Sequence, residues 1–194
     1  MTDSQYSLRD GTFGSNPPIT WEISLPELGA SLIGMAAGLK LAKPTNLAPQ
    51  ARTLPEGFIV CDAGICGGLE HIRLILLQAA KSWKDGLLLA RSRSLDLLMR
   101  MTVSSQIDAA IRASMISDSS EIALLGLTDS QDTALSTYIH FMERLGDCVS
   151  RQDSLLDLNS VKAERLSSLH SLGPGTNGSL IAQLVEMSSL LNVR

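Results

Sequence analysis

The sequence predicts a mixed α+β (α/β) fold in which a small central sheet of three to four strands is covered by helices. The chain has 194 residues, of which 44% are apolar, and this is enough to enclose one buried core. Short apolar runs of strand length alternate with longer stretches of helical periodicity. Glycine and proline clusters separate these segments, so a collagen, a coiled-coil rod and a wholly disordered chain are excluded.

The chain divides into three parts by composition. Residues 1–18 are polar and glycine-rich and end in two prolines, which predicts a flexible lead-in. Residues 19–172 are expected to form a single α/β domain. Residues 173–194 are expected to form a linker and an amphipathic helix that packs on the domain or on a partner.

The chemical balance indicates a cytoplasmic protein. The formal net charge is −4, and the three cysteines (Cys61, Cys66 and Cys148) form no CxxC pair, which favours a reducing compartment. The N-terminus lacks a basic start followed by an apolar run. The longest charge-free segment with an apolar leaning has 12 residues, between Glu27 and Lys40, too few to cross a bilayer, so no membrane contact is expected.

The elements of the first part follow from residue type and spacing. Residues 19–25 predict a strand, because isoleucine, threonine and tryptophan favour extended backbone. Residues 28–42 predict a helix, with Leu32, Ile33, Ala36 and Leu39 at helical spacing. Residues 43–56 contain three prolines and therefore predict a connecting loop that ends at Gly57.

The middle of the chain continues the alternation. Residues 58–63 predict a buried strand, and residues 69–84 predict a helix after the glycine pair at 67–68. Residues 95–103 alternate and predict a half-buried strand: Leu95, Leu97, Met99, Met101 and Val103 share one face, and Asp96, Arg100 and Thr102 fall on the other with Leu98.

A helix of about three turns should follow, capped by Ser104 or Ser105 and buried through Ile107, Ala110 and Ile111. Residues 121–127 predict another central strand. Residues 131–145 predict a helix that ends at Gly146 and buries four apolar residues: Leu135, Ile139, Met142 and Leu145. Helical patches then extend from residue 153 to 172, a break falls at residues 173–175, and an amphipathic helix covers residues 179–191.

Catalytic signatures are scarce. The sequence contains no GxGxxG, GxxxxGK[ST], GxSxG or HExxH pattern. Cys61, Cys66 and His71 fall at intervals of five, so a small α/β enzyme with a cysteine/histidine site is an alternative, although buried packing of these residues is favoured. Asp129 and Asp132 precede a helix, where negative charge is favourable without catalysis. We expect no catalytic residue, no metal and no small-molecule cofactor.

The charge distribution is more informative. Residues 70–112 carry seven basic and four acidic residues, a net of +3, whereas the rest of the chain carries nine basic and sixteen acidic residues, a net of −7. Arg91 and Arg93 flank a serine in a turn, and Arg100 is predicted to project away from the apolar face of the following strand. These three arginines could line one edge and contact phosphates. An ordinary solvated surface is the alternative.

The C-terminal segment is unusually apolar for a peripheral helix. Residues 180–191 hold seven large apolar side chains. Either this helix closes the core, or part of it docks on another protein. The candidate docking residues are Ile181, Leu184, Val185 and Leu191.

Three segments together resemble one family. They are ICGGLEHIRLILLQAAKSW (65–83), LLARSRSLDLLMRMTVSSQIDAAI (88–111) and ISDSSEIALLGL (116–127). The matching features are a Gly-x-x-His opening a long helix (Gly68, His71), a basic turn before an aliphatic segment, and a Ser-x-Gln-Ile step (Ser104, Gln106, Ile107) into a helix. These segments resemble the archaeal branch of the PRPK-binding-protein family, the small regulatory subunit of the KEOPS complex. Where that family usually carries a glycine before the Gln-Ile step, this chain has Val103, Ser104 and Ser105.

The resemblance implies a non-catalytic subunit of the machine that installs threonylcarbamoyl on the adenosine beside the tRNA anticodon. It implies two partners: the atypical kinase subunit of KEOPS and the single-stranded acceptor end of tRNA. A single-stranded tail needs cations for phosphates and apolar surface for bases. The expected tRNA-binding residues are therefore Arg91, Arg93, Arg100, Gln106 and Ile107. An orphan globular domain without a partner is the remaining reading.

Overall fold

A central antiparallel sheet organises the protein. The computed structural model describes residues 17–114, 119–172 and 177–191. The strand order is β1-β2-β4-β3, and the short β5 pairs with the end of β2. Every pairing is antiparallel, and the strands are β1 (Ile19–Leu25), β2 (Ala30–Leu41), β3 (Phe58–Asp62), β4 (Glu121–Thr128) and β5 (Val149–Arg151). The predicted mixed α+β class is confirmed, with five strands in the described residues instead of three or four.

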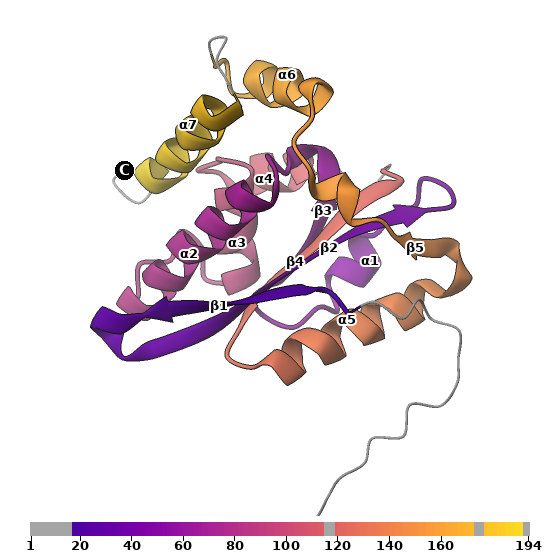
Figure 1. Cartoon of the computed structure of the whole chain (residues 1–194), viewed down its shortest axis with the longest axis horizontal. Coiled ribbons are helices and arrows are strands. Elements are labelled where there is room, and N and C mark those ends of the chain that lie inside the picture. Colours follow the sequence, from indigo (N-terminus) through magenta and orange to yellow (C-terminus); the bar gives the residue numbers. More distant parts are fainter. Residues whose placement is uncertain (1–16, 115–118, 173–176, 192–194) are drawn as a thin grey trace, which may run out of the picture.

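Helices cover both faces of the sheet. The first face carries α2 (Leu69–Asp85), α3 (Arg93–Met101) and α4 (Ile107–Ser114), which pack on residues such as Ile59 and Cys61. The opposite face carries α5 (Gln131–Leu145) and the short α1 (Ala48–Ala51), beside Phe58 and Val60. Figure 1 shows α5 along one side of the strands and α2, α3 and α4 along the other. The alternation of side chains along β3 therefore supplies both cores.

The last two helices lie together at one end of the molecule (Figure 1). They are α6 (Ser160–Leu169) and α7 (Asn177–Leu190), and α7 also packs on α2. Leu166, Leu180 and Leu184 form a small apolar cluster between them. No helix within the described ranges is long and apolar enough to cross a membrane. The predicted lead-in over residues 1–18 falls almost wholly outside the described residues, and the predicted break at residues 173–175 falls outside them entirely.

The predicted helix over residues 28–42 is wrong, because these residues form β2. Both faces of β2 are buried: Ala36 belongs to one core, and Met35 and Ala37 belong to the other. Because both faces of β2 are buried, apolar and polar residues do not alternate along it. The apolar residues of this segment therefore also fit a helical period. Close approach favours glycine here, since a Cβ at Gly38 would lie 2.5 Å from the Gln152 carbonyl oxygen.

The predicted strand over residues 95–103 is also wrong, because residues 93–101 form α3. Ser92 caps this helix by accepting a hydrogen bond from the Leu95 amide at 3.4 Å. Leucine and methionine dominate the segment, and both favour helix over strand. Leu97 and Met101 share a helical face at a spacing of four, which the alternating pattern had attributed to a strand face.

The other predicted helices and strands are present, apart from which side chains face inward. Two short elements were not predicted: α1 lies inside the predicted loop over residues 43–56, and β5 follows α5. In α5 the buried side chains include Ala134, Tyr138 and Phe141, whereas Leu135 and Ile139 are 39% and 40% exposed. In α4 only Ala110 of the three predicted residues is buried, and Ile107 and Ile111 are 40% and 46% exposed. The described part of α4 has eight residues, a little more than two turns, and the residues after Ser114 lie outside the described ranges.

Candidate functional site

The turn between α2 and α3 presents positive charge and apolar surface together. We call residues 86–93 the basic turn. Gly86 ends α2 in the left-handed conformation (φ 70°), and its amide donates to the Ser82 carbonyl oxygen. Arg91 and Arg93 are exposed, and beside them Leu87 is 59% exposed. The structure thus places the two predicted arginines close together on the surface.

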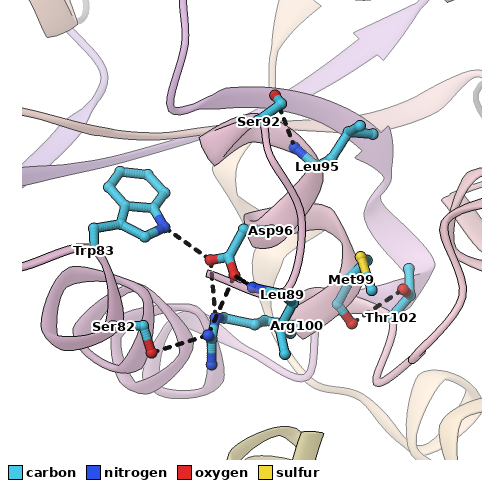
Figure 2. A network of polar contacts seen from close by, with 9 residues as sticks. All are labelled: Ser82, Trp83, Leu89, Ser92, Leu95, Asp96, Met99, Arg100 and Thr102. Carbon is cyan, nitrogen blue, oxygen red and sulfur yellow. Dashed lines mark hydrogen bonds and ion pairs between the residues drawn. The ribbon is translucent and has the colours of Figure 1, made fainter. Parts of the chain in front are cut away.

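A buried network holds the basic turn from the inside (Figure 2). The Asp96 carboxylate accepts hydrogen bonds from Trp83 Nε1 at 2.8 Å and from the Leu89 amide at 2.7 Å. It also accepts from Arg100 Nε at 3.0 Å and from Arg100 Nη2 at 3.2 Å. Arg100 Nη2 in turn donates to Ser82 Oγ at 2.9 Å. One carboxylate therefore joins α2, the turn and α3.

The prediction that Arg100 binds phosphate is contradicted by its burial. Arg100 and Asp96 are both 0% exposed, and they form an ion pair one helical turn apart. The helix, unlike the predicted strand, directs Arg100 inward toward this partner. Arg100 is therefore a structural cation that cannot reach a nucleic acid on the surface.

The outer side of the basic turn is organised by a second carboxylate. Glu56 accepts from Ser92 Oγ at 3.0 Å and from the Ser94 amide at 3.3 Å. Arg93 lies over the Trp83 ring with 5.3 Å between its guanidinium carbon and the ring centroid. A cation held against an aromatic face is restrained while its outer side stays open to solvent. The basic turn therefore holds Arg93 in place while the outer side of its guanidinium group faces solvent.

Gln106 and Ile107 lie at the other end of α3. Both are exposed at the start of α4, and Ser104 Oγ accepts from the Gln106 amide at 3.3 Å. Helix α3, about 12 Å long from Arg93 to Met101, and the four residues after it lie between Arg93 and Gln106. Val103, just before this step, has a φ of 49°, a left-handed conformation that is unusual for a β-branched residue. The predicted RNA residues thus form two exposed pairs instead of one cluster.

A groove begins at the basic turn and runs along the edge of the sheet. We call it the edge groove; its volume is about 340 Å³. Ser92 and Ser94 line it beside the turn. Its other walls come from α1, β3, α3 and α4, through residues that include Arg52, Leu54, Val60, Leu98 and Ile111. The surface is mainly apolar, with polar groups at the end that adjoins the turn.

The C-terminal helix α7 buries part of its apolar surface against the rest of the protein. Leu184 is 1% exposed and packs in the cluster with Leu166 and Leu180, so its predicted role in docking is contradicted. Ile181, Val185 and Leu191 are half-buried. The Val185 carbonyl oxygen accepts from Gln78 Nε2 at 2.9 Å, which fixes α7 on α2. The alternative in which this helix closes the core is correct for Leu184.

The three side chains of the candidate cysteine/histidine site lie in the core. Cys61, Cys66 and His71 are each 0% exposed. Hydrogen bonding to Cys66 and burial raise the pKa of the Cys61 thiol well above its usual value. A protonated, buried thiol is a poor nucleophile. In the described ranges, no three His, Cys, Asp or Glu side chains gather as metal ligands would. The arrangement favours packing over catalysis for these three residues.

His71 is held as a neutral hydrogen-bond acceptor. Its Nδ1 accepts from the Gly67 amide at 3.1 Å. Burial, with a smaller effect of His170, lowers the pKa of His71 to about 4. Asp129 and Asp132 are exposed at the start of α5, where Ser130 Oγ accepts from the Thr133 amide at 3.1 Å as the cap. The predicted helix-terminal setting of these two carboxylates is confirmed.

Sequence reasoning missed Asp96, Trp83 and Glu56 as the residues that position the site. The spacing of four between Asp96 and Arg100 was the available signal, but it has meaning only once the segment is assigned as a helix. Glu56 is 36 residues away from Ser92 in sequence, so no local pattern could pair them.

Comparisons with known proteins add no relative. No protein-family model matches the chain, and no curated protein matches its sequence.

Replacing Arg100 with Met should lower the free energy of unfolding by about 3–5 kcal/mol, because Asp96 would remain buried without its ionic partner. The matched control is Arg91→Met, a change at an exposed arginine that should cost less than about 0.5 kcal/mol. Urea denaturation of both variants at neutral pH measures the difference. Equal small effects would contradict the buried pair.

Acidification should destabilise the protein through His71. The folded-state pKa is about 4 and the unfolded value is about 6.5, so the unfolded chain binds the proton more tightly. The contribution of neutral His71 to the free energy of unfolding is fully present above about pH 6.5. It is lost as the pH falls toward 4, and the loss is about 3 kcal/mol. His71→Asn retains an acceptor for the Gly67 amide but does not titrate. Denaturation curves recorded across this pH range give the free energy of unfolding at each pH. This free energy should change more steeply with pH for the wild type than for the variant.

Proposed function

We propose that this protein is a non-catalytic subunit that binds RNA and a protein partner, with the role that its resemblance to the PRPK-binding-protein family implies. In that role it docks on the atypical kinase subunit of KEOPS and holds the single-stranded acceptor end of tRNA during threonylcarbamoyladenosine formation. The observation that carries the RNA part is the basic turn, with exposed Arg91 and Arg93 held beside exposed leucines by the network around Asp96.

The chemistry of the basic turn suits a single-stranded nucleic acid. Guanidinium groups bind phosphate oxygens in a bidentate manner, and unpaired bases need apolar or aromatic surface. Arg91 and Arg93 provide the guanidinium groups for phosphates. Leu87 and Leu88, which are 59% and 37% exposed, provide apolar surface for bases. A single small contact of this kind is weak alone, but a larger assembly strengthens it by raising the effective concentration. This supports a tethering role instead of independent RNA binding.

The backbone before Gln106 bears on the one departure from the family pattern. The family usually carries a glycine in the stretch now occupied by residues 103–105, and Val103 adopts a φ of 49°. Glycine is the residue that takes this conformation at no steric cost. A glycine would fit this conformation without strain, so the backbone here is compatible with the resemblance.

The alternative of a cysteine/histidine enzyme has less support. The Cys61 thiol, with its raised pKa, and His71 are enclosed in the core beneath α2, where a substrate has no access. We therefore infer no bond-making step for these residues.

Replacing both Arg91 and Arg93 with Ala should weaken tRNA binding by about tenfold and reduce the salt dependence by about one unit of log–log slope per lost phosphate contact. Filter binding of tRNA across a series of salt concentrations measures both quantities. The matched control is the Lys43→Ala/Arg144→Ala double variant, which removes two exposed cations outside the basic turn.

Two results would contradict the RNA proposal. An unchanged salt slope in the arginine variant would mean that the two guanidinium groups bind no phosphate. Equal affinity for tRNA with and without its terminal CCA would remove the role in holding the acceptor tail, whatever the arginine variant does.

Introducing a charge on the open side of α7 should disrupt kinase binding. Leu190 is 52% exposed, next to half-buried Leu191, so Leu190→Asp should weaken binding to the cognate kinase by at least about tenfold without unfolding the protein. Val161→Asp is the matched control, since Val161 is 73% exposed on α6. Titration calorimetry with the purified kinase measures both. Equal binding by the two variants would exclude this end of α7 as the docking surface.

A further inference from the structure

Two guanidinium groups rest on tryptophan rings along helix α2. Arg73 of α2 lies over the Trp21 ring of β1, with 5.4 Å between its guanidinium carbon and the ring centroid. Arg93 lies over the ring of Trp83, near the end of α2, at 5.3 Å. Both arginines are exposed, so one side of each planar group contacts an indole and the other side is open to solvent. Both rings pack in the same core, so the two flat cations lie on one side of the sheet.

Two lysines of α2 connect these stacks. Lys81 and Lys84 are exposed and follow Arg73 by eight and eleven residues, which are spacings that keep side chains on one side of a helix. They lie about 12 and 17 Å from Arg73 along the helix axis. Lys84 also lines a small hollow together with Arg93. We call Arg73, Lys81, Lys84 and Arg93 the cationic row, and it joins the basic turn at Arg93.

The cations of the row are largely free of internal partners. Lys81 lies 4.0 Å from the Glu27 carboxylate, and both side chains are more than half exposed, so this ion pair is weak. In the residues that the structure describes, Arg73, Lys84 and Arg93 form no ion pair. Three further carboxylates border the row without pairing with it: Glu70, Asp85 and Asp129. A ligand must therefore match the line of cations, because the surrounding surface is of mixed charge.

The combination of flat and compact cations points to the kind of ligand. Guanidinium planes stack on unpaired bases, and lysine ammonium groups bind phosphates as point charges. Proteins that bind single-stranded nucleic acids combine a line of cations with stacking surfaces. An acidic protein segment would use the charges and leave the open guanidinium faces unoccupied, and a duplex has no unpaired bases to stack. A single strand matches both features.

We propose that a single-stranded RNA runs along the cationic row, from the basic turn over α2 to the Arg73–Trp21 stack, with one base stacked on each of the two guanidinium groups. Lys81 and Lys84 bind the phosphates between these bases. This inference rests on the proposed RNA role of the basic turn and extends it. The protein then contacts several nucleotides that precede the acceptor end, as well as the end itself.

The two tryptophans provide the readout, because the chain contains no others. The purified full chain, labelled with nitrogen-15, is titrated with two oligoribonucleotides: the tetranucleotide ACCA and a twelve-nucleotide strand that ends in it. We expect the tetranucleotide to shift the indole N–H signal of Trp83 alone, and the longer strand to shift the Trp21 signal as well. An unmoved Trp21 signal at saturation with the longer strand would overturn the path along α2.

Removing two cations of the row should weaken binding of the longer strand only. Arg73→Ala/Lys84→Ala should lower its affinity by about tenfold, and its log–log salt slope by at least about 0.7 for the lost phosphate contact of Lys84. Binding of the tetranucleotide should not change. The matched control is Lys43→Ala/Arg144→Ala, which removes the same charge from exposed positions outside the row.

A second variant tests the row in the opposite direction. Glu27→Gln frees Lys81 from its weak ion pair, so it should strengthen binding of the longer strand by about two- to threefold. Glu22→Gln is the matched control, because Glu22 is exposed on β1 and forms no ion pair with any described residue. Equal gains in the two variants would mean that only net charge matters, and would overturn the role of the row.

The outcomes separate this inference from the proposed function. If Arg91→Ala/Arg93→Ala weakens binding of both strands while Arg73→Ala/Lys84→Ala binds them as the wild type does, the path along α2 is wrong and the role of the basic turn stands. If neither variant changes binding, both are wrong. A polyglutamate that shifts the Trp21 indole signal as much as the longer RNA does would also overturn the inference, since the row would then accept any polyanion.

Discussion

The buried Asp96–Arg100 ion pair is the constraint on which the surface features of this protein depend. Both side chains are 0% exposed, so two charges have been removed from water. Burial of that kind is tolerated only when the remaining donors and acceptors are satisfied. Here the partners are Trp83 and Ser82 of α2 and the backbone of Leu89 in the basic turn. The pair thereby fixes two helices and the turn that joins them as one unit.

The orientation of the basic turn follows from this unit. Its inward side is bonded to Asp96, so Arg91 and Arg93 are left to face solvent. Trp83 has two roles, since its indole N–H donates to Asp96 while its ring supports Arg93. The same helix α3 forms a wall of the edge groove, so the groove and the basic turn share a rigid support. In contrast, α6 and α7 are joined by the smaller cluster around Leu184.

Sequence patterns predicted those elements whose burial is one-sided or whose boundaries are marked. Helix α2 follows a glycine pair and ends at Gly86, and β3 follows a proline-rich loop. The two wrong assignments, β2 and α3, arose where one pattern fits both periods. Strand β2 is buried on both faces and shows no alternation, and α3 alternates because leucine and methionine occupy every second position. Because residues 95–103 were predicted as a strand, Arg100 was predicted to project away from the apolar face, whereas the helix directs it into the interior.

By itself, the sequence determined the mixed α+β class, the local excess of positive charge in residues 70–112 and the position of a basic turn, because these depend on composition and on neighbours along the chain. Tertiary structure alone decided which arginines reach solvent and which apolar residues of α7 are buried. Those outcomes depend on partners far away in sequence, such as Glu56 for Ser92 and Gln78 for Val185. Burial and pairing are properties of the packed chain, so no local pattern could reveal them.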